Sequence, residues 1–171
     1  MRTLSLLVGA MFLVAGCAGM QSGATSATAE LKNAQGQIVG TATLTEVASG
    51  VRIVVEARGL PAGEKGVHLH AVGKCDPPAF TSAGGHFNPE GKKHGLQSPD
   101  GPHAGDLPNL AIAANGSGRL ETTNTRASLG GGASSLFDAD GSAVVIHAAA
   151  DDMRTDPTGN SGGRIACGVI V

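Results

Sequence analysis

The sequence predicts an all-β protein, a β-sandwich with two long functional loops, and three observations lead to this fold class. Apolar side chains recur at every second position in Val51, Ile53 and Val55, which is the period of a half-buried strand. No amphipathic segment of the sequence is long enough to predict a helix. Residues 72–108 and 151–163 lack the alternation and are rich in Gly, Pro and Asp, as is typical of ordered loops that carry function.

Short β-rich runs follow one another along the chain. In order, the predicted strands span residues 29–34, 37–47, 51–56, 66–71, 110–114, 119–125, 143–148 and 165–171. A glycine follows Gln35, Asn115 and Asp140, and such pairs supply the positive φ of tight turns. Residues 59–63, with the sequence GLPAG, predict a loop.

Length and composition limit the classes of function. A chain of 171 residues suits one domain. It has no Trp and no Tyr, and aromatic residues make up 2% of it, which excludes a platform for stacking nucleic-acid bases. With a formal net charge of −2 it offers no basic surface for phosphate backbones, so we expect no nucleic-acid partner.

The N-terminus predicts an export signal. Arg2 is followed by an apolar stretch over residues 4–14 and by the small residues Ala15 and Gly16. This stretch is shorter than the roughly 20 residues that a membrane-spanning helix needs. We therefore expect export without a spanning segment.

The end of this signal, LVAGC at residues 13–17, resembles a bacterial lipobox, in which the cysteine becomes the lipidated first residue of the mature protein. The alternative is an ordinary signal cleaved nearby. The lipoprotein reading also accounts for the polar segment 18–28 as a tether. The predicted organisation is a lipoprotein-type signal peptide at 1–16, lipidated Cys17 with a flexible tether at 17–28, and one domain at 29–171.

Two further cysteines, Cys75 and Cys167, lie far apart in the sequence. In an exported chain they favour one disulfide. It would close a loop of about 90 residues and, on the chain-entropy model, contribute roughly 4 to 5 kcal/mol. The alternative is two buried free thiols, and a metal site is the weaker reading because neither cysteine lies in a C-x-x-C pair.

The chemistry of the sequence lies in its six histidines, His68, His70, His86, His94, His103 and His147. His68 and His70 are two apart on a predicted strand, so their side chains share a face. Asp106 follows His103 by three positions in a glycine-containing loop that can fold both onto one ion. One histidine alone is typically a surface or hydrogen-bonded residue, whereas the set favours a metal site. Imidazole suits copper and zinc, and the spacing leaves one site or two open.

Five motifs occur in a fixed order, at residues 66–70, 84–89, 101–109, 145–147 and 162–170. As a set they resemble the copper,zinc superoxide dismutase family, and the resemblance runs from about residue 29 to the end. It implies a Greek-key β-sandwich, or flattened eight-stranded barrel, for residues 29–171. It also implies an enzyme that converts superoxide to dioxygen and hydrogen peroxide.

The resemblance further implies one copper and one zinc ion per chain, with copper cycling between Cu(II) and Cu(I) and zinc fixing geometry and charge. The implied copper ligands are His68, His70, His86 and His147, and the implied zinc ligands are His86, His94, His103 and Asp106. His86 would bridge the metals. In the family the bridge to copper is released on reduction and the freed nitrogen takes up a proton, so His86 is also expected to act in catalysis.

Other family positions are matched outside the ligand set. Asp151 matches a carboxylate that accepts hydrogen bonds from a copper ligand and a zinc ligand, here His68 and His94. Thr158 matches a threonine that narrows the channel to small ligands. The alternative for Asp151 is a solvated loop aspartate.

Arg164 matches the arginine that attracts and orients the superoxide anion, and a disulfide between Cys75 and Cys167 would help to hold it in place. The loop at 152–158 departs from the family because it looks shorter than in many eukaryotic relatives and lacks their Glu/Glu/Lys group for electrostatic steering. The candidates to replace that group are Arg154, Lys92 and Lys93.

We expect the protein to protect the bacterial cell envelope from extracytoplasmic superoxide, attached to the membrane through lipid on Cys17 and facing the periplasm. The sequence leaves a homodimer or a monomer open. Two alternatives are an envelope lipoprotein of the same fold that stores or delivers copper, and a zinc-only structural module. Arg164 and the complete ligand set argue against both.

Overall fold

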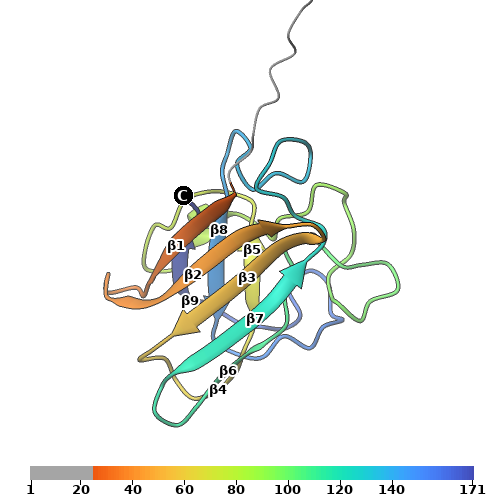
Figure 1. Cartoon of the computed structure of the whole chain (residues 1–171). Coiled ribbons are helices and arrows are strands. Elements are labelled where there is room, and N and C mark those ends of the chain that lie inside the picture. The colour runs from red at the N-terminus through yellow and green to blue at the C-terminus, as the bar shows by residue number, and fades with distance from the viewer. Residues whose placement is uncertain (1–24) are drawn as a thin grey trace, which may run out of the picture.

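The computed structural model describes residues 25–171, which form an antiparallel β fold (Figure 1). Its strands are β1 (Ser26–Lys32), β2 (Ile38–Val47), β3 (Gly50–Ala57), β4 (Gly63–Lys65), β5 (Val67–His70), β6 (Leu110–Ile112), β7 (Gly118–Asn124), β8 (Ala143–His147) and β9 (Arg164–Val169). In this range the helical content is one 3-10 turn, η1 (Thr81–Ala83), and no helix is long and apolar enough to cross a membrane. The predicted all-β class is confirmed.

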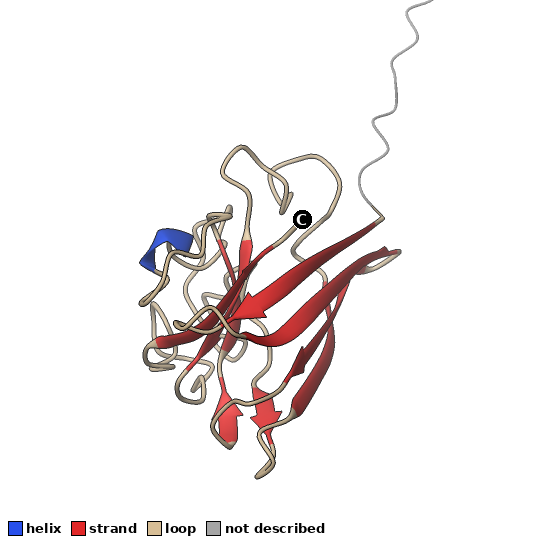
Figure 2. Cartoon of the chain, turned by 90° about the vertical axis from the view of Figure 1, so that its left-hand side faces the viewer, coloured by secondary structure: helices blue, strands red, loops and turns tan. Residues whose placement is uncertain are grey.

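The strands form one sheet in the order β4-β6-β7-β3-β2-β1-β9-β8-β5. Only Gly66 separates β4 from β5, so the first and last members of the sheet belong to one stretch of chain. The sheet therefore curls into a nearly closed, flattened barrel around one core (Figure 2). Counted as one interrupted strand, β4 and β5 give the eight strands expected from the resemblance. The connections from β3 to β4 and from β7 to β8 join strands that are not neighbours in the sheet, as in a Greek key.

The period-two pattern that predicted the strands is confirmed by their burial. In β3 the side chains of Val51, Ile53 and Val55 are buried, while Arg52 and Glu56 between them are exposed. β1 and residues 40–44 of β2 alternate in the same way. One face of each strand thus lies against the core and the other meets solvent.

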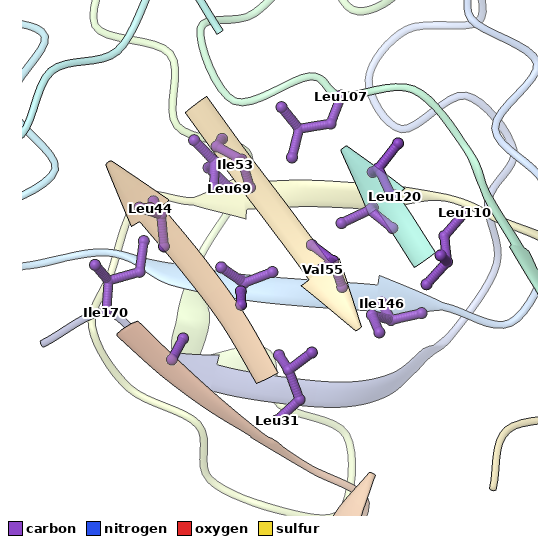
Figure 3. Packing of buried hydrophobic residues seen from close by; sticks show 14 of the residues in the cluster. Leu31, Leu44, Ile53, Val55, Leu69, Leu107, Leu110, Leu120, Ile146 and Ile170 are labelled. Carbon is purple, nitrogen blue, oxygen red and sulfur yellow. The ribbon is translucent and has the colours of Figure 1, made fainter. Parts of the chain in front are cut away.

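β5 and β8 differ because every residue in both strands is buried. Leu69 and Ile146 point into the core (Figure 3), whereas His68, His70 and His147 lie on the face covered by the long loops. The loops replace solvent on this outer face. Polar side chains on these two strands are therefore held in a dry environment.

The core is made mainly of aliphatic side chains from strands all around the barrel. Its large members include Leu31, Leu44, Ile53, Val55, Leu69, Leu107, Leu110, Leu120, Ile146 and Ile170 (Figure 3). A smaller cluster outside the barrel contains Phe80, Ala83, Ala143, Val145 and Cys167, with half-buried Cys75 packed against it. Each buried Leu, Ile or Val contributes roughly 1.5–3 kcal/mol. β8 is thus packed on both faces, which fixes the position of His147 at its end.

Turns lie where the sequence predicts them, and strand ends agree with the predicted bounds to within two residues except in two places. The predicted turn glycines Gly36, Gly116 and Gly141 have φ of 76°, 80° and 65°. β1 begins at Ser26 rather than at residue 29, inside the segment expected as a tether. β4 was not expected, since three residues are too few to display an alternation. The predicted signal peptide and Cys17 lie outside the described residues.

Candidate metal centre

The centre is assembled where the loop over residues 72–108 folds back along β5. His70 forms an isolated antiparallel bridge with His86, and His68 forms one with Asp106. Two separate stretches of this loop therefore pair with the strand that carries the first two histidines. This pairing brings residues from distant parts of the sequence onto one face.

Leu69, between the two strand histidines, holds both loop stretches through its backbone. Its N–H donates to the Gly105 carbonyl at 2.8 Å, and its carbonyl accepts the N–H of Phe87 at 2.8 Å. The Gly105 N–H donates in turn to the Phe87 carbonyl at 2.7 Å. A Cβ at Gly105 would lie 2.3 Å from the Leu69 carbonyl oxygen, so only glycine permits this approach.

Four histidines form a first cluster, with His68 and His70 from β5, His147 from β8 and His86 from the loop. All four are buried, and one possible ligand atom from each lies within 4.8 Å of the others. Nδ1 of His68 and Nε2 of the other three have no hydrogen-bond partner. A buried polar atom left unpaired costs about 1–3 kcal/mol, so four such nitrogens in one place indicate a ligand. A set of four imidazoles fits copper.

The opposite ring nitrogens of this cluster are bonded to the protein. Nδ1 of His70 donates to the Gly84 carbonyl at 3.0 Å, and Nδ1 of His147 donates to the Gly162 carbonyl at 3.1 Å. A carbonyl oxygen can only accept, so these nitrogens carry the hydrogen. The unpaired nitrogens then hold the lone pair that a metal requires.

Burial also keeps these imidazoles neutral. It lowers the pKa of His68 to about 3, of His70 to about 2 and of His147 to about 4. Burial lowers the pKa of His86 as well, although its contact with a carboxylate opposes this. Neutral imidazole is the form that ligates a metal.

A second cluster surrounds the carboxylate of Asp106. Its Oδ1 lies 3.0 Å from Nδ1 of His86, 3.0 Å from Nδ1 of His94 and 3.3 Å from Nδ1 of His103. Its Oδ2 accepts the backbone N–H groups of Gly95 at 2.8 Å and of His103 at 3.0 Å, which fixes the carboxylate. Three imidazoles and one carboxylate fit a tetrahedral zinc ion.

The charges of the second cluster suit a cation. Burial alone would raise the pKa of Asp106, but hydrogen bonds from His103, His86 and His94 hold it far below its usual value. Burial would likewise lower the pKa of His94, yet its bonds to Asp106 and Asp151 raise it to about 9. The site thus attracts positive charge, which a proton or a metal ion can supply.

Asp151 connects the two clusters. Its Oδ2 lies 2.7 Å from Nε2 of His68, and its Oδ1 lies 3.1 Å from Nε2 of His94. Asn109 holds the backbone of Asp151 through two hydrogen bonds of 2.9 Å, and the Met153 N–H donates to Oδ1. The carboxylate is buried and ionised, since these donors outweigh the burial that would raise its pKa. One side chain therefore orients a ring in each cluster.

Comparison with known proteins gives the family. A family model described as copper/zinc superoxide dismutase matches residues 38–170. The chain belongs to the copper/zinc superoxide dismutase family. It is 51% identical over 146 residues to superoxide dismutase (Cu-Zn) 2 of Aquifex aeolicus, covering 84% of this chain and 85% of that protein. It is 44% identical over 148 residues to superoxide dismutase (Cu-Zn) of Caulobacter vibrioides, covering 85% of both.

A solved structure agrees with this assignment. The SOD-like protein from Bacillus subtilis matches with a TM-score of 0.80 and 41% identity, covering 84% of this chain and 97% of that one. The chain is therefore a superoxide dismutase by family, and its cofactors are copper and zinc. The two buried clusters provide donor sets that fit these metals.

In this superoxide dismutase, Arg164 is held beside the first cluster. Its Nη1 donates to the Phe80 carbonyl at 2.5 Å and its Nη2 to the Gly84 carbonyl at 2.6 Å. The Gly84 carbonyl also accepts from His70, so one peptide group holds the arginine and a histidine of the cluster. The charge of Arg164 is felt by His70 and His147, where it adds to the lowering of the pKa that burial causes.

The predicted disulfide between Cys75 and Cys167 of the dismutase is present and joins residues 92 apart in the sequence. The alternative of two free thiols is wrong. Cys167 lies in β9 and Cys75 in the loop that also contains Phe80 and Gly84. The bridge therefore ties the two carbonyls that hold Arg164 to the strand on which Arg164 lies.

The residues expected near the approach to the dismutase site lie at the surface. Lys93 pairs with Oδ2 of Asp156 at 3.2 Å, so its charge is partly balanced. Nε of Arg154 donates to the neutral side chain of Gln97 at 3.0 Å, which leaves its charge uncompensated by this contact. The exposed residues of this group are Thr158, Lys92, Lys93 and Arg154.

Sequence reasoning missed several supports of the site. Asn109 positions Asp151, and the carbonyls of Gly84 and Gly162 choose the tautomers of two histidines. Asp156 accepts the backbone N–H of His94 at 2.8 Å. No sequence signal marks a backbone acceptor, and a lone loop Asn or Asp has no periodicity that would reveal its partner.

Proposed function

We propose that this dismutase converts superoxide to dioxygen and hydrogen peroxide at two adjacent metals. Copper is held by His68, His70, His86 and His147, and zinc by His86, His94, His103 and Asp106. The observation that carries the proposal is the placement of His86 in both clusters, with Nε2 unpaired in the first and Nδ1 3.0 Å from Asp106 in the second.

One geometric alternative concerns the second cluster. A group of mutually close donors around Asp106 contains His68 in place of His103. We assign His103 to zinc because its Nδ1 lies 3.3 Å from both His86 Nδ1 and Asp106 Oδ1. Both nitrogens of His68 are already accounted for, by the first cluster and by Asp151.

Bound copper supplies one-electron redox chemistry, and zinc supplies fixed positive charge. The protein holds the imidazoles neutral and oriented, through the Gly84 carbonyl for His70 and through Asp151 for His68. Nε2 of His86 is the atom that we assign to carry a proton to the reduced product. Its dry surroundings keep bulk water away from this nitrogen.

Arg164 is the residue that we assign to orient the superoxide anion. Two carbonyls hold its guanidinium beside His70 and His147, so the cation is fixed before the substrate arrives. Thr158, exposed on the loop that contains Asp151, is the candidate to restrict the approach to small anions. Arg154 is the candidate for further electrostatic attraction.

The proposed location is the periplasmic side of a bacterial cell envelope, with the protein anchored through lipid on Cys17. The N-terminal sequence supports export, and the Cys75–Cys167 disulfide is typical of an oxidising compartment. Superoxide is charged and crosses bilayers poorly, so an exported dismutase would act on superoxide outside the cytoplasm and protect the envelope.

The activity is tested on purified mature protein, assayed as isolated and after copper and zinc loading, with metal content determined on the same samples. We expect turnover to follow copper occupancy. His147→Ala should abolish turnover and retain zinc, because His147 belongs only to the first cluster. Activity retained in this variant would defeat the copper assignment, and full metal occupancy without turnover would favour a metal-storing or metal-delivering protein.

The location is tested with Cys17→Ser in the full-length chain. We expect a labelled fatty acid to be incorporated into the wild type, which lies in the membrane fraction, and not into the variant, because Cys17 is the proposed attachment point. The specific activity of the two forms should match. A wild type that takes up no label would contradict the lipid anchor and favour an ordinary cleaved signal.

A further inference from the structure

The end of β7 lies beneath the loop that supplies two residues of the second cluster. Nδ2 of Asn124, the buried last residue of β7, donates to the Ala104 carbonyl at 2.7 Å. Two positions later, Nε of Arg126 donates to the His103 carbonyl at 3.4 Å, and Nη2 donates to the Asp106 carbonyl at 3.2 Å. Three carbonyls within residues 103–106 are thus bound by two side chains.

We propose that Asn124 and Arg126, together called the β7 clamp, are positioning residues for zinc. The β7 clamp holds the turn at residues 103–106 so that His103 and Asp106 face each other before the metal binds. This inference rests on the zinc assignment of the proposed function and adds residues that touch neither metal nor substrate.

The β7 clamp is itself rigid. Asn124 pairs with Val51 of β3 in the barrel sheet, and its Oδ1 accepts the backbone N–H of Arg126 at 2.9 Å. The side chain of Asn124 therefore holds the backbone N–H of Arg126 as well as the Ala104 carbonyl. Supports built on a sheet hold a site more precisely than supports on a free loop.

The chemistry of Arg126 suits this role better than that of a lysine. A planar guanidinium can donate to two carbonyls at once, whereas an ammonium is a point donor on a flexible stem. Arg126 is half-buried, which lowers the pKa of its guanidinium, while the charges of Asp106 and Glu90 oppose that change. The cation therefore lies close enough to Asp106 to be attracted by it.

The contacts of the β7 clamp confine its expected effect to one metal. It touches residues 103–106, whose side chains His103 and Asp106 belong to the second cluster. The histidines of β5 and β8 are held by other groups, namely Asp151, Gly84 and Gly162. Loss of the clamp should weaken zinc binding more than copper binding.

The test measures zinc and copper release from the metal-loaded mature protein into excess chelator. Arg126→Gln removes the fork, and Arg126→Lys keeps the charge. Arg119→Gln is the matched control, because Arg119 lies on β7 itself but pairs with Glu56 and Glu121 at the surface. We expect zinc release to be about 10-fold faster in Arg126→Gln, in line with other supports of metal ligands, and intermediate in Arg126→Lys.

Two further measurements on the same samples distinguish a specific effect on zinc from a general loss of stability. Copper release and the unfolding temperature of the metal-free protein should match those of Arg119→Gln. Zinc release equal to that control would overturn the proposal, as would an equal acceleration of copper and zinc release. If Arg126→Gln does not fold, Arg126→Lys decides by the same criterion.

The metal content of the wild type distinguishes a failure of the zinc assignment from a failure of the β7 clamp. Wild-type protein that binds no zinc overturns the zinc assignment and this inference with it. Wild-type protein that binds zinc, together with variants that release it at the wild-type rate, overturns the role of the β7 clamp alone.

Discussion

At the scale of single residues, the histidines of the site divide their two ring nitrogens between protein and metal. His70 and His147 each give Nδ1 to a backbone carbonyl and leave Nε2 unpaired. The protein acceptor selects the tautomer, and the tautomer decides which nitrogen has a free lone pair. A change in the acceptor should therefore alter metal binding without touching a ligand.

Asp151→Asn tests this dependence. The substitution keeps the size of the side chain but places an N–H₂ group opposite Nε2 of His68 or of His94, both of which need an acceptor. We expect the affinity for each of the two metals to fall by about 10- to 100-fold, measured by competition with a chelator of known affinity. Asp152→Asn is the control, because Asp152 is exposed and bonds within its own loop. Equal affinities in the two variants would contradict the role of Asp151.

The buried histidines predict how the stability of the metal-free protein depends on pH. The pKa values of His68, His70 and His147, lowered by burial to about 3, 2 and 4, lie below the value of about 6.5 in an unfolded chain. Between those limits the unfolded state binds more protons, so stability falls as the pH falls below 6.5. Each group contributes at most about 1.4 kcal/mol per pH unit.

His94 has the opposite sign. Its pKa is raised to about 9, so its contribution is complete below pH 6.5 and is lost as the pH rises toward 9. Denaturant unfolding of the metal-free protein between pH 4.5 and 9 should therefore give a maximum near neutral pH. A free energy of unfolding that is flat or rises between pH 6.5 and 4.5 would contradict neutral burial of the three histidines.

The sequence predicted the donors of the site better than their supports. Histidines and Asp106 are recognisable by type and by the motifs around them, and the structure brings them together. The acceptors Gly84 and Gly162 act through backbone carbonyls, which every residue has, so nothing in the sequence distinguishes them. Arg126 was not singled out either, because its contact with the 103–106 turn depends on how β7 crosses beneath the loop.

At the scale of elements, the site depends on how closely the loop approaches β5. Both the N–H and the carbonyl of Leu69 are hydrogen-bonded to loop residues, and Gly105 fits against the carbonyl without a side chain. This packing sets the distance between the strand histidines and the loop ligands. The fold of the loop and the geometry of the site are thus one property.

Gly105→Ala should disturb the fold of the loop and the geometry of the site together. The added Cβ would lie 2.3 Å from the Leu69 carbonyl oxygen. This oxygen cannot move away without breaking its hydrogen bond with the Phe87 N–H. We expect a loss of about 1–3 kcal/mol in unfolding free energy and reduced retention of both metals. Gly131→Ala is the control, because no atom lies within 4 Å of its added Cβ. A thermal unfolding midpoint equal to that of the control would contradict the close approach.

Element prediction succeeded where one face of a strand meets solvent. β1 and β3 show the expected alternation, and the turn glycines lie where the sequence placed them. β5 and β8 were also located, but their complete burial depends on loops far away in the sequence. β4 escaped prediction because GEK at residues 63–65 has no periodicity and pairs with β6 only through the curvature of the barrel.

At the scale of the whole molecule, the disulfide joins the long loop to the barrel. Cys75 lies in the long loop and Cys167 in β9, with 92 residues between them in the sequence. The cross-link reduces the freedom of the unfolded chain and keeps the loop against β9 in the folded one. Arg164 lies on β9, and the two carbonyls that accept its hydrogen bonds lie in the loop, so the disulfide joins the two segments that carry this contact.

Replacement of Cys75 and Cys167 by Ala should cost about 2–5 kcal/mol in the free energy of unfolding, measured in urea on the metal-free protein. Reductant should destabilise the wild type by a similar amount and leave the double variant unchanged. Equal stability of wild type and variant would show that the loop holds its place without the bridge. The metal-loaded forms should differ less, because bound metal also ties the loop to β5.

The crossing of residues 63–70 from one side of the barrel to the other has a consequence for solubility. β4 bonds to β6 and β5 bonds to β8, so each half-strand leaves one side of its backbone open to a neighbour. For β5 that neighbour is the loop at His86 and Asp106. Exposed strand edges recruit other chains into intermolecular sheets. The residues that hold the metals therefore also act as a guard against aggregation.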